Sequence, residues 1–229
     1  MTAPGRTADA AVRRRYGRYV GVTRPAGDTG AADPAVTAVL AAYAAGAATE
    51  HAALTAVAAS RLLVPVVAVL AEAGADGAEK ETEMALPTLI GNDGRKAVIA
   101  FTGAETVRRW RADARPVPVS APRLWPAAEA EQADAVVIDV AGPVPLVVEG
   151  ARLRALAGGA PPPLPHEDPD IRAQVAAVTG DFTLEPGGQD AELTVTLKAA
   201  DPAVARATAE AIAARLASRL RRGIAIRIG

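Results

Sequence analysis

The fold is decided by residues 84–119, which read MALPTLIGNDGRKAVIAFTGAETVRRWRADARPVPV. Two apolar segments, 84–90 and 95–101, flank the sequence Gly91-Asn92-Asp93-Gly94. Asn, Asp and Gly at such a position are typical of the tight turn of a β-hairpin. The sequence therefore predicts two antiparallel strands joined by this turn.

A helix is expected directly after the hairpin. Thr102-Gly103-Ala104-Glu105 has the spacing of a capping box, in which the threonine and the glutamate bind each other's backbone amides. Trp110 follows Val107 by three residues, so both lie on one helix face and we expect the Trp110 ring to be buried. The alternative is an exposed anchor, because tryptophan flanked by arginines is typical of interaction surfaces. Trp110 is therefore also a candidate partner contact.

Further elements are predicted on both sides of this unit. Asp33-Pro34 begins a helix that ends at Gly46, and Thr49 begins a second one. The remaining predictions are strands at 62–70, 117–119, 135–140 and 144–148, a helix at about 123–132 with Pro126 near its start, and a short helix around Leu153 and Leu156. The hairpin is antiparallel while helices separate other strands, so we expect an α/β fold with a mixed sheet.

A smaller unit is expected at the carboxyl end of the chain. The proline-rich residues 159–165 predict an extended, semi-rigid linker. Residues 166–229 have the pattern of a helix followed by ββαβ, with Val204 on the buried ridge of the long helix. Alternation around 193–197 predicts a sheet with one face in water. We expect a main mixed α/β domain at 33–158 and a small α+β unit at 166–229.

The amino-terminal residues 1–32 form a basic tail. They contain six arginines and two aspartates, whereas the following region to residue 158 has a net charge of −4. No apolar period runs through them, so we expect no fixed structure. Arg13, Arg14, Arg15 and Tyr16 could neutralise phosphates and stack on bases, which makes nucleic acid a candidate partner. The simpler interpretation is an extension without a partner.

Composition excludes several classes of site. The 229 residues contain no cysteine and two histidines, which excludes thiolate nucleophiles and disfavours a multi-histidine metal centre. Glycine-rich phosphate loops and the serine-hydrolase motif are absent from the sequence. The longest apolar run has about half of the ~20 residues that a membrane-spanning helix needs. We therefore expect no catalytic residue, cofactor, metal or membrane contact.

Acidic residues gather at three places. Residues 166–170, His-Glu-Asp-Pro-Asp, could ligate a metal, but Asp-Pro favours the cap of a helix. The glutamates within residues 79–83 favour a solvated loop. Asp139 follows an apolar strand, where ligand-binding and catalytic carboxylates often lie in α/β sheets. The alternative is that Asp139 accepts hydrogen bonds from the turn before Gly142, since no partner base is visible.

Residues 84–119 resemble the SseB (enhanced serine sensitivity) N-terminal-domain family. The strand that ends in Phe101-Thr102 and the helix that carries Trp110 are the most distinctive features. The resemblance covers roughly 33–158, and the alanine-rich composition is similar to that of actinobacterial members. It implies an intracellular α/β domain of unknown biochemical role, with no catalytic residue to carry over.

The leading functional hypothesis is a cytoplasmic, non-catalytic binding or regulatory module with a protein partner of unknown identity. One alternative is an uncharacterised enzyme that uses Asp139 and nearby acids. The other is an RNA- or ribosome-associated protein that binds through the arginine-rich tail. A pocket that holds Asp139 together with a second titratable residue of strongly perturbed pKa would favour the enzyme, and neighbouring translation genes would favour the RNA hypothesis.

Overall fold

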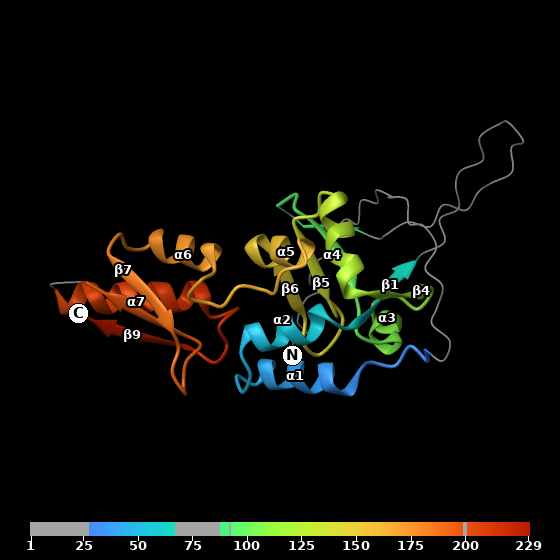
Figure 1. The fold of residues 1–229 in the computed structure, drawn as a ribbon, viewed down its shortest axis with the longest axis horizontal. Coiled ribbons are helices and arrows are strands. Elements are labelled where there is room, and N and C mark those ends of the chain that lie inside the picture. The colour runs from blue at the N-terminus through green and yellow to red at the C-terminus, as the bar shows by residue number, and fades with distance from the viewer. Residues whose placement is uncertain (1–27, 67–87, 92, 199–200) are drawn as a thin grey trace, which may run out of the picture.

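The computed structural model describes residues 28–66, 88–91, 93–198 and 201–229 (Figure 1). Three hydrophobic clusters form in this part of the chain: a large one and a small one around the main sheet, and another around a carboxyl-terminal sheet. No helix within these ranges is long and apolar enough to cross a bilayer. The α/β fold class that the sequence predicts is confirmed.

The main sheet is mixed, as expected. Its strands are β2 (Thr88–Ile90), β3 (Lys96–Ala100), β5 (Ala135–Ile138) and β6 (Leu146–Glu149), in that order across the sheet. β2 and β3 form the predicted antiparallel hairpin, β3 and β5 are parallel, and β5 and β6 are antiparallel. β3 and β5 thus end at the same edge of the sheet, which positions the residues that follow them.

A two-stranded ribbon extends this sheet. β1 (Arg61–Val66) pairs antiparallel with β4 (Arg115–Ser120). The backbones of Leu63 and Phe101 exchange hydrogen bonds of 2.7 and 2.8 Å, which join the ribbon to the residue after β3. The predicted continuation of the first strand to residue 70 lies outside the described residues.

Five helices pack around the main sheet: α1 (Pro34–Ala44), α2 (Glu50–Ala58), α3 (Ala104–Trp110), α4 (Ala121–Ala130) and α5 (Gly150–Ala157). The predicted caps of the first two are confirmed, because Asp33 accepts from the amide of Ala35 and Thr49 from that of Ala52. α4 starts earlier than predicted, and Pro126 lies inside it rather than near its start. Trp125, on the same helix, is fully buried in the main core.

The predicted capping box at the start of α3 is wrong. Gly103 is the N-cap residue and provides no side-chain cap. The Thr102 hydroxyl donates instead to Asp139, at 2.6 Å, and Glu105 pairs with Arg109 on the helix surface. A carboxylate from a neighbouring strand therefore binds the threonine that the capping box would use.

The carboxyl-terminal unit has the predicted helix followed by ββαβ. Its elements are α6 (Pro169–Ala176), β7 (Phe182–Pro186), β8 (Leu193–Leu197), α7 (Pro202–Leu216) and β9 (Ile224–Ile228). β8 is central, antiparallel to β7 and parallel to β9. One detail of α7 differs from expectation: Val204 is 56% exposed, and Ala205 is the buried residue of its first turns.

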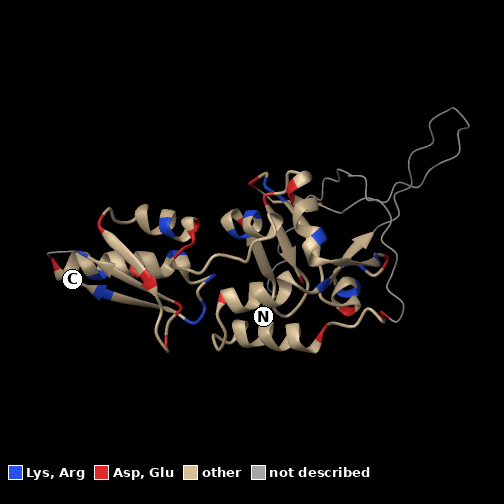
Figure 2. Ribbon diagram, in the orientation of Figure 1, with Lys and Arg blue, Asp and Glu red and all other residues tan. Residues whose placement is uncertain are grey.

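Buried charges connect the two parts of the chain. The Glu50 side chain, at the start of α2, is 4% exposed and pairs with Arg152 of α5 and with Arg219, which follows α7. Nη2 of Arg219 also donates to Oδ2 of Asp168 at 2.6 Å. Figure 2 shows acidic and basic residues together where the carboxyl-terminal unit meets the helices of the main sheet. Buried ions are stable only when paired, so this network favours one docking geometry.

Glu192, just before β8, adds a second link. Its Oε2 accepts from the backbone amide of Glu50 at 2.8 Å and its Oε1 from that of Arg222 at 3.1 Å. Burial raises the pKa of Glu192, and the two amide hydrogen bonds oppose that rise. The predicted wet face of the sheet is confirmed only in part: Glu185 and Arg227 on that face are exposed, whereas Glu192, which caps α2, and Thr194 on the central strand are buried.

Candidate functional site

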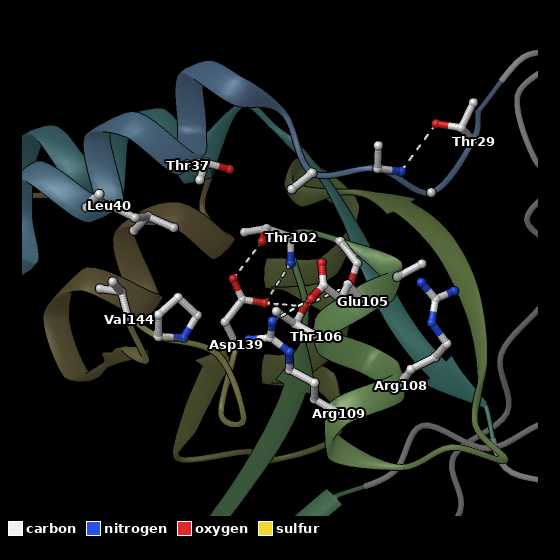
Figure 3. Close-up of a pocket in the computed structure, with 17 residues that line it drawn as sticks. Thr29, Thr37, Leu40, Thr102, Glu105, Thr106, Arg108, Arg109, Asp139 and Val144 are labelled. Carbon is white, nitrogen blue, oxygen red and sulfur yellow. Dashed lines mark hydrogen bonds and ion pairs between the residues drawn. The ribbon is translucent and has the colours of Figure 1, made fainter.

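A cavity of about 560 Å³ lies over the carboxyl ends of the parallel strands β3 and β5 (Figure 3). In α/β sheets this edge is the usual place for ligands. The wall comes from residues 29–32, the start of α1, the residues after β3, α3, and the residues after β5. Its lining residues are Thr29, Gly30, Ala31, Ala32, Thr37, Leu40, Ala41, Thr102, Gly103, Ala104, Glu105, Thr106, Arg108, Arg109, Asp139, Pro143 and Val144.

Asp139 lies in the cavity wall with both carboxylate oxygens occupied. Oδ1 accepts from the Thr102 amide at 2.9 Å, and Oδ2 from the Thr102 hydroxyl at 2.6 Å. The Thr106 hydroxyl lies 2.9 Å from Oδ1 and 2.7 Å from the Gly103 carbonyl oxygen, so these two acceptors share its hydrogen. Asp139 is 4% exposed. The Asp139 carboxylate thus ties the residues after β5 to Thr102 and to the first turn of α3, as the dashed lines of Figure 3 show.

The backbone of Asp139 also has an uncommon conformation. Its φ is +52°, in the left-handed region that aspartate tolerates better than most residues. Its amide donates to the Ala100 carbonyl and its own carbonyl accepts from Gly142. A Cβ at Gly142 would lie 2.8 Å from the Cβ of Asp139. The turn after β5 thus requires glycine at 142, and it places the Asp139 side chain toward Thr102 instead of toward the turn amides.

The outer wall is held by contacts that the sequence did not reveal. Arg61 of β1 donates to the carbonyls of Thr102 and Ala31, and it lies 3.2 Å from Asp28. The Ala104 amide donates to the Gly30 carbonyl at 2.7 Å. Residues 28–32, which the sequence analysis assigned to the tail, therefore form a wall of the cavity. The signal that could have indicated Arg61 is an arginine at the start of an otherwise apolar strand.

Two arginines of α3 lie on the cavity's exposed side. Arg109 pairs with Glu105 one turn earlier on the same helix. Arg108 is exposed and makes no ion pair with any other described residue. Apolar and hydroxyl side chains form most of the remaining lining, so the site combines an apolar surface, threonine hydroxyls and the exposed guanidinium of Arg108.

The described lining offers threonine hydroxyls, carboxylates, arginines and apolar side chains. It includes no histidine, cysteine or serine, and its hydroxyl–carboxylate pairs, Thr102 and Thr106 with Asp139, lie within the cavity wall. Within the described ranges no three histidine, cysteine, aspartate or glutamate residues are grouped as a metal site would require. The residues that could contact a ligand are the threonines, the arginines and the apolar side chains of α1.

The other candidate residues lie elsewhere. Trp110 is half-buried and packs on Phe101 with ring centroids 5.8 Å apart, in a small cluster with Val107, and it does not line the cavity. Its predicted burial is thus only partial. Arg13, Arg14, Arg15 and Tyr16 lie outside the described residues, as do the glutamates within 79–83.

The acidic cluster at residues 166–170 has the structural role that the sequence favoured. Asp168 is the N-cap of α6 and accepts from the Asp170 amide at 2.8 Å. Asp170 in turn accepts from the Ala151 amide at the start of α5, at 2.7 Å. The cluster therefore caps one helix in each part of the chain.

Comparison with known proteins is informative for the main sheet. No curated protein and no solved structure matches the chain. The family model described as SseB protein N-terminal domain matches residues 36–155, which include the main sheet, most of its helices and the lining of the Asp139 cavity except residues 29–32. This match covers more than half of the sequence, and the chain therefore belongs to the SseB family.

Proposed function

We propose that the protein is a cytoplasmic, non-catalytic binding or regulatory module, and that its ligand or protein partner occupies the Asp139 cavity. The observation that carries this proposal is that both carboxylate oxygens of Asp139 already accept hydrogen bonds from the protein. Thr102 and Thr106 donate to both carboxylate oxygens, so the carboxylate is engaged within the cavity wall. Its role in this proposal is to shape the wall.

The lining indicates the chemistry of the ligand. Leu40, Val144 and the neighbouring alanines offer an apolar surface, and Arg108 offers an exposed guanidinium that no described residue pairs with. A peptide segment or small molecule with an apolar side chain and a carboxylate fits both features. Guanidinium–carboxylate pairing is directional, so Arg108 would fix the ligand's orientation while the apolar wall supplies contact area.

The test compares two cavity variants with a matched control. Thr37→Trp fills the cavity from the exposed face of α1, and Arg108→Ala removes the rim charge. Arg123→Ala removes an equally exposed arginine from α4 and is the control. Tagged proteins are purified from native lysate, and bound proteins and small molecules are identified by mass spectrometry. We expect a ligand or partner that is lost from both cavity variants and retained by the control; equal retention by all three would refute the proposal.

The alternatives make different predictions. An enzyme that uses Asp139 would need a ligand-induced release of the carboxylate from Thr102. Contact with RNA through Arg13, Arg14, Arg15 and Tyr16 would be lost on deletion of residues 1–27 and unaffected by Thr37→Trp. Crosslinking to RNA in cells separates this hypothesis from a cavity-binding one.

We also propose that the chain is divided into a main domain and a small carboxyl-terminal unit. The separate hydrophobic clusters support a main domain at 33–158, a linker at 159–165 and a small unit at 166–229. The buried charges at Glu50 and Arg219 support a docked arrangement of these parts.

A further inference from the structure

A second cavity lies where the main domain meets the carboxyl-terminal unit. Its volume is about 220 Å³, enough for a small ion or one functional group of a larger molecule. It shares no lining residue with the Asp139 cavity. Its lining residues are Arg95, Glu149, Gly150, Arg152, Asp170, Gln174 and Arg219.

The lining holds three arginines and two carboxylates, and both carboxylates are already engaged. Glu149 pairs with Arg95 and lies 3.8 Å from Arg152. Oδ2 of Asp170 accepts from the Ala151 amide, which begins α5. Among the lining residues the positive charges exceed the negative ones by one, with Glu50 and Asp168 pairing Arg152 and Arg219 from outside the lining, and the lining adjoins the amino-terminal end of an eight-residue helix.

Arg152 is buried in this lining with one donor unused. Its side chain is 3% exposed, and its Nη1 donates to Glu50 and to the Val147 carbonyl. Its Nε is buried and has no hydrogen-bond partner among the described residues. A buried donor without an acceptor is unfavourable and rare in folded proteins. Burial lowers the pKa of Arg152, and the charge of Glu50 opposes that effect.

Unused donors remain on the other two arginines as well. Arg219 uses Nε and Nη2 for Glu50 and Asp168, and no hydrogen bond from its Nη1 is present in the described part of the chain. Arg95 binds Glu149 through Nη2, and its side chain is half exposed at the mouth of the cavity. Three guanidinium groups with free N–H bonds thus line one small space.

We propose that this cavity binds a phosphate group, which would accept from Arg152 and from the free N–H groups of Arg95 and Arg219. Guanidinium groups match phosphate oxygens in geometry and charge, and a helix amino terminus adds a favourable dipole. The phosphate is either free inorganic phosphate or the terminal group of a phosphomonoester, whose remainder would extend past Arg95 to solvent.

Such a ligand would couple the two parts of the chain. Arg219, Asp170 and Gln174 belong to the carboxyl-terminal unit, whereas Arg95, Glu149, Gly150 and Arg152 belong to the main domain. A ligand that contacts both parts binds the docked state better than any undocked one. By mass action, phosphate at a concentration c then stabilises the docked state by RT ln(1 + c/Kd), a free energy that grows with the logarithm of c above Kd.

The experiment measures phosphate binding by isothermal titration calorimetry on the full chain, at constant ionic strength with chloride as the replaced anion. Three proteins are compared: the wild type, Arg95→Ala, and Arg206→Ala as control. Arg206 resembles Arg95 because it is exposed and paired with one glutamate, but it lies on the surface of α7. Parallel titrations with glycerol phosphate distinguish a phosphomonoester from free phosphate.

We expect one saturable site per chain, a Kd at least tenfold weaker in Arg95→Ala, and an unchanged Kd in Arg206→Ala. Tighter binding of glycerol phosphate would identify a phosphomonoester as the ligand class. Absence of saturable binding by the wild type, or equal Kd values in all three proteins, would overturn the proposal. If Arg95→Ala did not fold, Gln174→Leu would replace it, since it removes a half-buried polar wall without changing the charge.

Discussion

Substitution of Glu50 by glutamine is the most direct test of the buried charge network. The side chain keeps its size, but Arg152 and Arg219 lose the carboxylate that both of them contact. The exposed fractions of the three side chains are 4% for Glu50, 3% for Arg152 and 11% for Arg219. Solvent therefore cannot replace the lost charge, and the two guanidinium groups would repel each other.

The magnitude follows from this burial. Removal of one partner from a buried ion pair costs about 3–5 kcal/mol of unfolding free energy. In a chain of this length ~1 kcal/mol lowers Tm by roughly 2–4 °C, so Glu50→Gln should lower it by about 6–20 °C. Glu105→Gln is the matched control, because Glu105 also pairs with an arginine but is 69% exposed. An exposed pair of this kind contributes only ~0.3–0.5 kcal/mol.

The assay is urea and thermal unfolding followed by circular dichroism, with tryptophan fluorescence as a second probe. A double-mutant cycle with Arg219→Gln isolates the coupling between the two side chains, which should be within ~0.5–3 kcal/mol. Equal stability of Glu50→Gln and Glu105→Gln would refute the reasoning. It would mean that water reaches Glu50 or that the carboxyl-terminal unit does not dock as described.

Three further predictions concern single positions. Trp125→Ala should cost about 3–5 kcal/mol in urea unfolding, and Trp110→Ala less, because Trp110 is only half-buried; a larger loss for Trp110 would reverse this order. Gly142→Ala should cost about 1–3 kcal/mol, since its Cβ would lie 2.8 Å from that of Asp139; wild-type stability would show that the turn relaxes. Burial raises the pKa of Glu192 above 4.5, so its contribution to stability is greatest below that pH and falls as the pH rises. Unfolding free energies measured from pH 4 to 8 should therefore fall less with pH in Glu192→Gln than in the wild type, and parallel curves would contradict this.

Local chemistry explains the parts of the fold that the sequence predicted correctly. The caps at Asp33 and Thr49 satisfy amides within three residues, so their effect is visible in the sequence alone. The hairpin at 88–100 likewise depends on its own turn. The mixed sheet follows from these elements, because a hairpin next to a strand–helix–strand crossover has one antiparallel and one parallel pairing.

The candidate site was predicted only in part, because its contacts join distant segments. Asp139 was identified from its place after an apolar strand, and it does line the cavity. Its partner Thr102 was assigned to a capping box, since nothing in the local sequence shows that a carboxylate 37 residues later competes for the hydroxyl. Arg61 was missed for the same reason: its acceptors are backbone carbonyls of two segments that only the fold brings together.

The buried charges show why the carboxyl-terminal unit could not be placed from the sequence. Glu50 and Arg219 each lie at a helix end where the dipole alone explains the sign of the charge, so neither indicates a partner. In the structure they bind each other across the two parts of the chain. The SseB match includes Glu50 and Arg152 but ends before Asp168 and Arg219. The matched region therefore contains a complete sheet, whereas several hydrogen bonds of its most buried carboxylate come from residues beyond it. Because a buried ion is costly without its counter-charge, the surface of the SseB domain around Glu50 is adapted to this carboxyl-terminal unit.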